Sequence, residues 1–338
     1  MLDVAREAGV STATVSHVLN GTRQVSVKTR GRVGDAVTRI GYTPNGVARA
    51  LRTASTDSVG LVISDVANPY YADVIKGIEA MVGQSGRRLL LANADDDAER
   101  ELQVVRALVQ RRVDGLIVAT TSSAGDGAVG YLESRDLPVV LIDRLIGSGF
   151  DQVGASNEEP MRALVAHLAE LGHERIGIVA GVTGISTTEE RLAGYRRALA
   201  GAGLEYDDAL VCAGRSRVRP AADAVAELMA LRRPPTALVA GNNLMAIGVL
   251  GALRDLGRVV PGDVALVAFD DFEWSELLAS PLTTVAQPGR AIGEEAVRLL
   301  LRRIADPRTP PETLRLDPEV IHRRSCGCPF DAPRIAVR

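Results

Sequence analysis

Cysteine and histidine are the side chains best able to bind metals or act as nucleophiles, and this chain has only three cysteines and four histidines. Cys326 and Cys328 lie two positions apart, whereas Cys212 is isolated. A tetrahedral zinc site needs four ligands, and the sequence around the pair offers no further cysteine or histidine cluster to complete one. We therefore expect no metal site and no cofactor.

Enzymatic chemistry is also poorly supported. The four histidines, His17, His167, His173 and His322, are scattered along the chain, and we expect none of them to have a nucleophile or metal partner. The chain has no G-x-x-x-x-G-K-[ST] phosphate loop, no G-x-S-x-G elbow and no G-x-G-x-x-G directly after an expected strand. An α/β enzyme remains the less favoured class, and we expect a protein that is not an enzyme.

Charge is unevenly distributed along the chain, although the formal net charge is only −3. Residues 1–56 carry eight basic and three acidic side chains, a net +5, which leaves −8 on the remainder. A small basic head on a large acidic body indicates a polyanionic partner for the head. Chance variation in charge is the alternative at this point.

The basic head has the pattern of a helix-turn-helix. Residues 3–8 and 12–20 have helical spacing, and Gly9 between them can adopt the positive φ of a tight corner. Ser11 is a suitable N-cap for the second helix. A seam of small apolar residues can join the two helices: Val4, Ala8, Val10, Val15 and Leu19. Residues 27–40 predict a third helix, although an ordinary αα-hairpin shows the same spacing.

Residues 42–52 predict a short hinge helix after the head. Pro44 and Asn45 are a start signal, and Ala48 and Leu51 lie on one helical face. Such a short helix does not persist alone in water, and its glycine costs about 1 kcal/mol relative to alanine. We expect it to form only when a partner holds it.

The remaining chain alternates between short apolar runs and segments of helical period. The expected strands are residues 58–65, 87–93, 114–120, 138–143, 175–180, 237–241, 263–270 and 283–287. The expected helices include residues 72–84, 98–110, 158–171, 190–200, 220–231 and 244–256. This alternation predicts parallel sheets covered on both faces, and the number of strands favours two doubly wound α/β subdomains that form a cleft at the carboxyl ends of their strands.

Eleven short motifs occur along the chain. They are D-V-A-x-x-A-G-V-S (3–11), T-V-S-H-V-L-N (14–20), V-S-x-x-T-R (25–30), G-Y-x-P-N-x-x-A-R-x-L (41–51), V-D-G-L-I (113–117), P-V-V-L-I-D-R (138–144), L-G-H-x-R-I (171–176), R-L-x-G-Y (191–195), N-L-M-A-I-G (243–248), F-D-D (269–271) and P-L-T-T-V-x-Q-P (281–288). In this order they resemble the lactose-repressor (LacI/GalR) family of bacterial transcription regulators over nearly the whole chain. Each motif alone is weak, but the ordered set is specific.

The resemblance implies a helix-turn-helix head, a hinge helix and a core similar to periplasmic binding proteins. We place the head domain at residues 1–44, the hinge and linker at 45–57, the core at 58–325 and a tail at 326–338. Within the core, the N-subdomain is expected at about 58–156 plus 288–310. The C-subdomain is expected at about 157–287 plus 311–325.

The resemblance also implies a homodimer whose heads read two half-sites of an operator in double-stranded DNA. Thr12, Ala13, Ser16 and His17 would face base edges in the major groove. The remaining expected contacts, mostly to phosphates, are Thr14, Asn20, Arg23, Lys28, Asn45, Ala48 and Arg52. Leu51 matches the apolar wedge that this family inserts into the minor groove.

A small effector is expected in the cleft. The matching positions are Tyr70, Tyr71, Asp143, Arg191, Asn242, Asp270 and Trp274. Their carboxylate, amide and guanidinium groups suit vicinal hydroxyls, and aromatic faces pack on a sugar ring, although each aspartate could instead cap a strand end. Purine-binding relatives have an arginine and a stacking phenylalanine where this chain has Ile185 and Arg215. We therefore favour a sugar or sugar derivative, with a purine or another metabolite as the alternative.

The sequence lacks a membrane span, a signal core and a leucine heptad, and these features bear on location and assembly. No apolar run approaches the roughly 18–20 residues of a membrane span, and the N-terminus lacks an apolar signal core. We expect a cytoplasmic protein with no membrane partner. The tail has two prolines and no leucine heptad, which favours a dimer over a tetramer. A sugar-binding module without DNA function is less favoured. Such a protein would need an export signal, and it would have no basic helix-turn-helix head.

Overall fold

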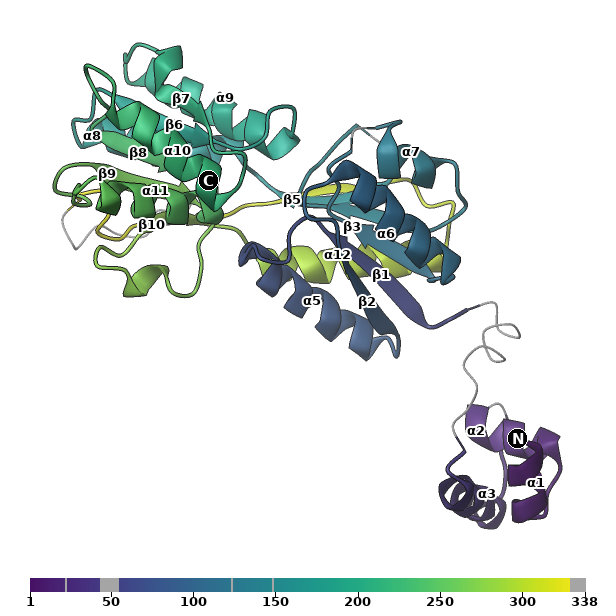
Figure 1. Cartoon of the computed structure of the whole chain (residues 1–338). Helices are drawn as coiled ribbons and strands as arrows, with labels where there is room; N and C mark the ends of the chain where they lie inside the picture. The colour runs from purple at the N-terminus through teal and green to yellow at the C-terminus, as the bar shows by residue number, and fades with distance from the viewer. Residues whose placement is uncertain (22, 43–54, 123, 148, 329–338) are drawn as a thin grey trace. The chain divides into compact units, whose positions relative to one another are not determined.

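The computed structural model describes residues 1–21, 23–42, 55–122, 124–147 and 149–328. The chain divides into two compact units, the head (Met1–Thr56) and the core (Asp57–Arg338), shown in Figure 1. The expected hinge residues Asn45, Ala48, Leu51 and Arg52 lie outside the described residues. No helix in the described part of the chain combines the length and apolar character that crossing a membrane requires.

The head contains the three helices that the sequence predicts. They are α1 (Leu2–Ala8), α2 (Thr12–Asn20) and α3 (Val27–Ile40). Gly9 ends α1 in the left-handed conformation at φ 60°, and Ser11 caps α2 by accepting a hydrogen bond from the Thr14 amide at 3.1 Å. The seam is confirmed: Val4, Ala8 and Val15 are buried, and Val10 and Leu19 pack against them.

The first sheet of the core has six parallel strands in the order β11-β5-β4-β3-β1-β2. Their bounds are β1 (Ser58–Ile63), β2 (Arg88–Asn93), β3 (Gly115–Val118), β4 (Val139–Ile142), β5 (Asp151–Ala155) and β11 (Thr313–Leu316). Alternate residues of the central strands enter two separate apolar clusters, one on each face. Helices α5 (Tyr70–Gln84) and α12 (Gly289–Ala305) cover one face, and α6 (Ala98–Gln110) and α7 (Gly127–Glu133) the other (Figure 1).

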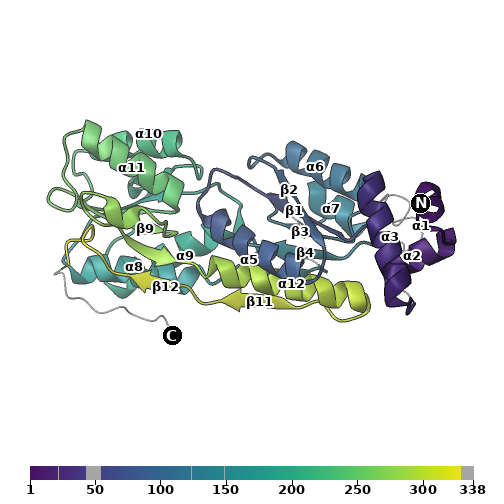
Figure 2. The ribbon, with the colours of Figure 1, turned by 90° about the horizontal axis from the view of Figure 1, so that it is seen from below.

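The second sheet has the order β12-β10-β9-β8-β6-β7. Its strands are β6 (Ile176–Ala180), β7 (Val211–Ala213), β8 (Ala237–Ala240), β9 (Ala265–Phe269), β10 (Thr283–Ala286) and β12 (Glu319–Ile321). Helices α8 (Glu158–Glu170) and α9 (Ser186–Gly201) cover one face, whereas α10 (Val218–Met229) and α11 (Asn243–Asp255) cover the other (Figure 2). Two single-turn helices, η1 (Asp208–Leu210) and η2 (Ser275–Leu277), lie in loops.

Helices α5 and α12 lie side by side in both views (Figures 1 and 2), and glycine permits the close approach. A Cβ on Gly77 would lie 2.2 Å from the Arg290 carbonyl oxygen, and one on Gly293 would lie 2.3 Å from that of Val74. Each helix therefore presents glycine where the backbone of the other comes nearest. This pairing joins residues near the two ends of the core sequence.

The structure differs from the sequence expectations in two respects, namely the sheet to which residues 313–316 belong and the direction of one strand in the second sheet. Residues 313–316, expected in the C-subdomain, form β11, which pairs in parallel with β5 of the first sheet. The chain therefore returns to the second sheet only at β12, which pairs antiparallel with β10, so this sheet is mixed. Apolar residues alternate only weakly in the short strands β11 and β12. Each strand is therefore assigned to its sheet by pairing with a strand that is distant in sequence. Strands β5 and β7 were likewise not predicted.

Candidate functional site

The described part of the expected DNA-binding surface centres on the start of α2. Thr12 and Ala13 are exposed in its first turn, whereas Ser16 and His17 are half-buried one turn later. The Thr14 hydroxyl lies 2.9 Å from that of Ser11, so Thr14 contributes to the cap of the helix. The side chain of Asn20 lies outside the part of the chain that the structure describes.

Basic side chains of the head fall into two groups. Arg39 pairs with Glu7, and Arg32 donates to the Gly9 carbonyl oxygen at 3.3 Å, so both join α3 to α1 and its corner. Arg23 and Lys28, the expected phosphate contacts, are exposed between α2 and the first turn of α3. Helix packing therefore uses part of the positive charge and leaves another part at the surface.

A polar cavity of about 40 Å³ lies where the two sheets of the core face each other. It brings together six of the seven expected effector residues, Tyr70, Tyr71, Asp143, Arg191, Asn242 and Asp270. The cavity is also lined by residues that the sequence patterns do not predict, which are Ser64, Asp65, Asn68, Asp96, Arg144, Thr187, Ser216 and Leu244. Several of these follow the carboxyl end of a parallel strand, a signal that could have identified them.

Asp143 and Asp270 occupy equivalent positions in the two subdomains. Each follows a central strand, β4 or β9, and each has φ 68°. A left-handed backbone costs about 1–3 kcal/mol in most non-glycine residues, and such strain concentrates at functional sites. Burial raises the pKa of both carboxyls, against the opposing charge of Arg191 and, at Asp143, of Arg144.

Arg191 of α9 links several walls of the cavity. Its Nε donates to Asn157 Oδ1 at 2.9 Å, and another guanidinium nitrogen donates to the Gly241 carbonyl oxygen at 2.7 Å. A third nitrogen lies 3.8 Å from Asp270 Oδ1. The guanidinium carbon lies 3.8 Å from the centre of the Phe269 ring, a cation–π contact that holds the group against the end of β9.

A second network surrounds Asp143. The Tyr71 hydroxyl donates to Asp143 Oδ2 at 3.1 Å and lies 2.8 Å from Ser64 Oγ. Arg144 donates to Asp96 Oδ1 at 2.6 Å. The Tyr70 hydroxyl, in contrast, is buried and has no hydrogen-bond partner within the described residues. An unpaired buried hydroxyl is costly, so it is available to a ligand.

Two further groups hold the opposite wall. Gln287 Nε2 donates to Asp270 Oδ1 at 2.5 Å. Asn242 caps α11 by accepting from the Met245 amide at 2.8 Å, which leaves its amide nitrogen available on the cavity side of the helix end. Both subdomains therefore contribute hydrogen-bond donors and acceptors to the cavity, and neighbouring side chains hold these groups in place.

Trp274 does not line this cavity. Its indole, 42% exposed, packs on the Phe272 ring at a centroid distance of 4.3 Å. It lines a larger neighbouring opening of about 540 Å³ that shares Tyr70 and Asp270 with the polar cavity. Five residues beyond the end of β9, the loop has already turned away from the cavity.

The glycine pattern G-x-G-x-x-G does occur at residues 125–130, where it opens α7 after a loop from β3. The Gly125 amide donates to Glu133 Oε2 at 3.1 Å, and the Ala128 amide donates to Ser122 Oγ at 3.3 Å. Two amides of this turn are therefore already hydrogen-bonded, one to the Glu133 carboxylate and one to the Ser122 hydroxyl. The pattern closes a loop here and offers no phosphate cradle.

The structure groups Cys326 and Cys328 with two histidines, a cluster that the sequence does not predict. His322 lies only four residues before Cys326, and the fold brings His167, from the distant helix α8, to the same place, so that all four side chains meet. The separation of 159 residues between His167 and Cys326 concealed this cluster.

Comparison with known proteins agrees with both units. Residues 1–45 match the family described as bacterial regulatory proteins, lacI family, and residues 165–326 match a periplasmic binding protein-like domain. The HTH-type transcriptional repressor PurR of Aliivibrio salmonicida (strain LFI1238) is 34% identical over 325 residues, covering 96% of this chain and 97% of the relative.

Solved structures show the same likeness. One titled as a complex of the transcriptional regulator CelR with cellobiose is 34% identical, with a TM-score of 0.74, over 96% of this chain and 98% of that one. The lac repressor dimer bound to operator and the anti-inducer ONPF has a TM-score of 0.86 at 27% identity, with the same coverage. The chain therefore belongs to the LacI family of DNA-binding bacterial transcriptional repressors.

Proposed function

We propose that this repressor binds its operator as a homodimer and that a sugar or sugar derivative in the polar cavity controls its affinity for DNA. The observation that carries the proposal is the lining of the cavity. Asp143 and Asp270 approach from opposite subdomains with Arg191 between them. A ligand with several hydroxyls can donate to the two carboxylates and accept from the guanidinium.

The chemistry of the walls favours a sugar over a purine. Leu244 is the one aliphatic side chain among the lining residues, and the rings of Tyr70 and Tyr71 meet edge to face at 5.1 Å. Pockets for flat, largely apolar ligands are lined mainly by hydrophobic and aromatic side chains, which this lining largely lacks. Ile185 and Arg215, which replace the purine-contacting residues in the resemblance, do not line the cavity. The purine alternative rests on the PurR relatives.

Effector binding should separate or rearrange the two walls. A cavity of about 40 Å³ holds a few waters, whereas ligand pockets usually measure about 300 Å³ or more. Arg217 donates to the Asp95 carbonyl oxygen at 2.8 Å, and Arg315 donates to Glu190 Oε1 at 2.7 Å, so both contacts bridge elements of different sheets. Such contacts can break and re-form as the cleft opens, which gives the effector a way to alter the core.

Isothermal titration against a panel of sugars and purine bases tests the effector class. We expect one sugar to bind, and the ligand at a hundred times its dissociation constant to add about 2.7 kcal/mol of apparent stability. Asp270→Asn and Asp143→Asn should abolish binding, whereas Asp73→Asn, on the exposed face of α5, should not. Because its loop shares Asp270 with the cavity, Trp274 emission should shift on binding. Binding of a purine alone would overturn the sugar assignment.

Selection of operator sequences from random DNA tests the other half of the proposal. We expect a near-palindromic site bound by two chains. Arg23→Ala and Lys28→Ala should weaken binding to operator and to random DNA alike and reduce the salt dependence, as expected for phosphate contacts. Leu51→Ala should weaken operator binding far more than binding to random DNA, because a wedge contributes only when the DNA bends. Four chains per complex in sedimentation would contradict the dimer.

A further inference from the structure

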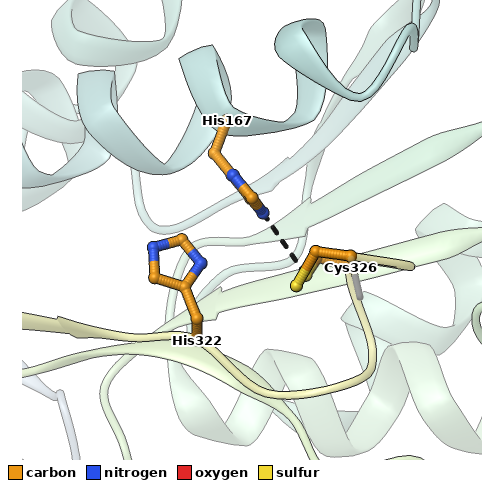
Figure 3. Close-up of side chains that lie close together, drawn as sticks. His167, His322 and Cys326 are labelled. Carbon is orange, nitrogen blue, oxygen red and sulfur yellow. Dashed lines mark hydrogen bonds between the residues drawn. The ribbon is translucent and has the colours of Figure 1, made fainter. Parts of the chain in front are cut away.

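Four side chains of metal-binding type meet beside the second sheet of the core. His167 comes from the last turns of α8, whereas His322, Cys326 and Cys328 come from the segment after β12. One ligand atom of each residue lies within 4.8 Å of those of the others. Figure 3 shows the rings of His167 and His322 approaching the Cys326 sulfur from two sides.

The spacing of these atoms fits a small tetrahedral site. Zinc binds cysteine sulfur at about 2.3 Å and histidine nitrogen at about 2.0–2.1 Å, so its four ligands lie roughly 3.3–3.8 Å apart. His167 Nε2 lies 3.4 Å from Cys326 Sγ, and the two sulfurs lie 3.0 Å apart. The histidine rings meet at 4.4 Å between centroids. A tetrahedral site needs the two sulfurs to move apart from 3.0 Å and the most distant ligand atoms, now within 4.8 Å of one another, to come closer.

An unpaired atom points to a ligand here. His322 Nδ1 is buried and has no hydrogen-bond partner among the described residues. A buried polar atom without a partner costs about 1–3 kcal/mol, and a metal ion would remove that cost.

Contacts around the ligands hold the cysteine turn in place. Ser325 Oγ donates to the Leu266 carbonyl oxygen at 2.5 Å and accepts from the Thr283 amide at 2.8 Å. The Thr283 hydroxyl donates to Cys326 Sγ at 3.3 Å. Such outer contacts orient metal ligands and tune their affinity. The turn is therefore positioned by β9 and β10 independently of the histidines.

We propose that His167, His322, Cys326 and Cys328 form a structural zinc site that anchors the end of the core to α8. Two imidazoles and two thiolates are a soft ligand set, typical of zinc and unsuited to magnesium or calcium. Four protein ligands leave no open position for substrate, which is the arrangement of structural sites. The ion would hold the segment after β12, a three-residue edge strand, against a helix that begins next to the effector cavity.

Metal content of the full-length protein tests the proposal. Protein purified under reducing conditions, with any affinity tag removed, should contain about one zinc per chain by mass spectrometry. Cobalt(II) in its place should give the visible absorption of a tetrahedral site with thiolate ligands. His167→Gln and Cys328→Ser should each lower zinc affinity, measured against a chelating dye, by more than the roughly 10- to 100-fold typical of outer contacts. These two carry the test, because Cys326 is fully buried and its substitution also disturbs packing.

Two matched variants serve as controls. Cys212→Ser removes the remaining cysteine, which lies in β7, and His173→Gln removes a histidine whose Nδ1 is paired with the Thr236 hydroxyl at 3.0 Å. Both should keep full zinc affinity. Chelation should lower the melting temperature and speed amide exchange in residues 319–328. Equal zinc loss in the controls, no zinc bound by reduced protein, or a Cys326–Cys328 disulfide that persists under reduction would overturn the proposal.

Discussion

Replacing Arg191 with alanine should destabilise the core as well as abolish effector binding. The guanidinium is only 11% exposed, and Asp270 beside it is 4% exposed. Alanine leaves the Gly241 carbonyl oxygen and the Asn157 side-chain oxygen without their donor, and it leaves the Asp270 carboxylate without its nearest cation. The substitution therefore leaves the buried Asp270 carboxylate with a charge that nothing nearby compensates.

The size of the effect follows from these contacts. Breaking a buried ion pair by removing one partner costs about 3–5 kcal/mol, which is a large part of a typical stability of about 5–15 kcal/mol. With a urea dependence of roughly 3 kcal/mol per molar, the midpoint of unfolding should fall by about 1–1.7 M. Adding Asp270→Asn removes the stranded charge, so the double variant should recover about 1–3 kcal/mol.

Urea unfolding followed by Trp274 emission measures this change, because the single tryptophan of the chain lies in the core. Arg254→Ala removes an exposed ion pair with Asp255 and should shift the free energy of unfolding by no more than about 0.5 kcal/mol. The folded-state pKa of Asp270 is raised, so the stability linked to its protonation is present at acid pH and lost as pH rises through that pKa. Arg191→Ala should therefore lie closer to the parent near pH 4 than near pH 7. A midpoint shift below about 0.3 M, or no recovery in the double variant, would refute this reasoning.

Three other predictions concern packing, pH and fraying. Gly293→Ala should destabilise the core by about 1–3 kcal/mol in thermal unfolding, whereas Gly251→Ala, with open space around its Cβ, should be neutral or slightly stabilising. Burial opposes ionisation of Asp271, but hydrogen bonds from Arg323 and Ser275 lower its pKa, so Asp271→Asn should destabilise at neutral pH and lose its effect as pH falls through that lowered pKa. Residues 2–5 should exchange amide hydrogens faster than α2, because Met1 gives α1 no side-chain cap; equal protection would contradict this.

Local sequence patterns determined most of the elements and their order. The three helices of the head follow from Gly9, Ser11 and a seam repeating at helical spacing, signals that act within a few residues. The central strands are apolar throughout because helices cover both faces of the sheet, and such runs are visible without knowing their neighbours. The polar residues at their carboxyl ends could be placed in a cleft for the same reason.

Tertiary contacts alone decided the rest. Strand β11 joins the first sheet and β12 the second although only two residues separate them, because each is too short to specify its partner. Trp274 lies outside the cavity because its loop turns after Phe272, which no local pattern records. His167 meets Cys326 across 159 residues of sequence. Ligand spacing within one segment is a local property, whereas a cluster assembled from a helix and a distant chain end exists only after the sheet has brought them together.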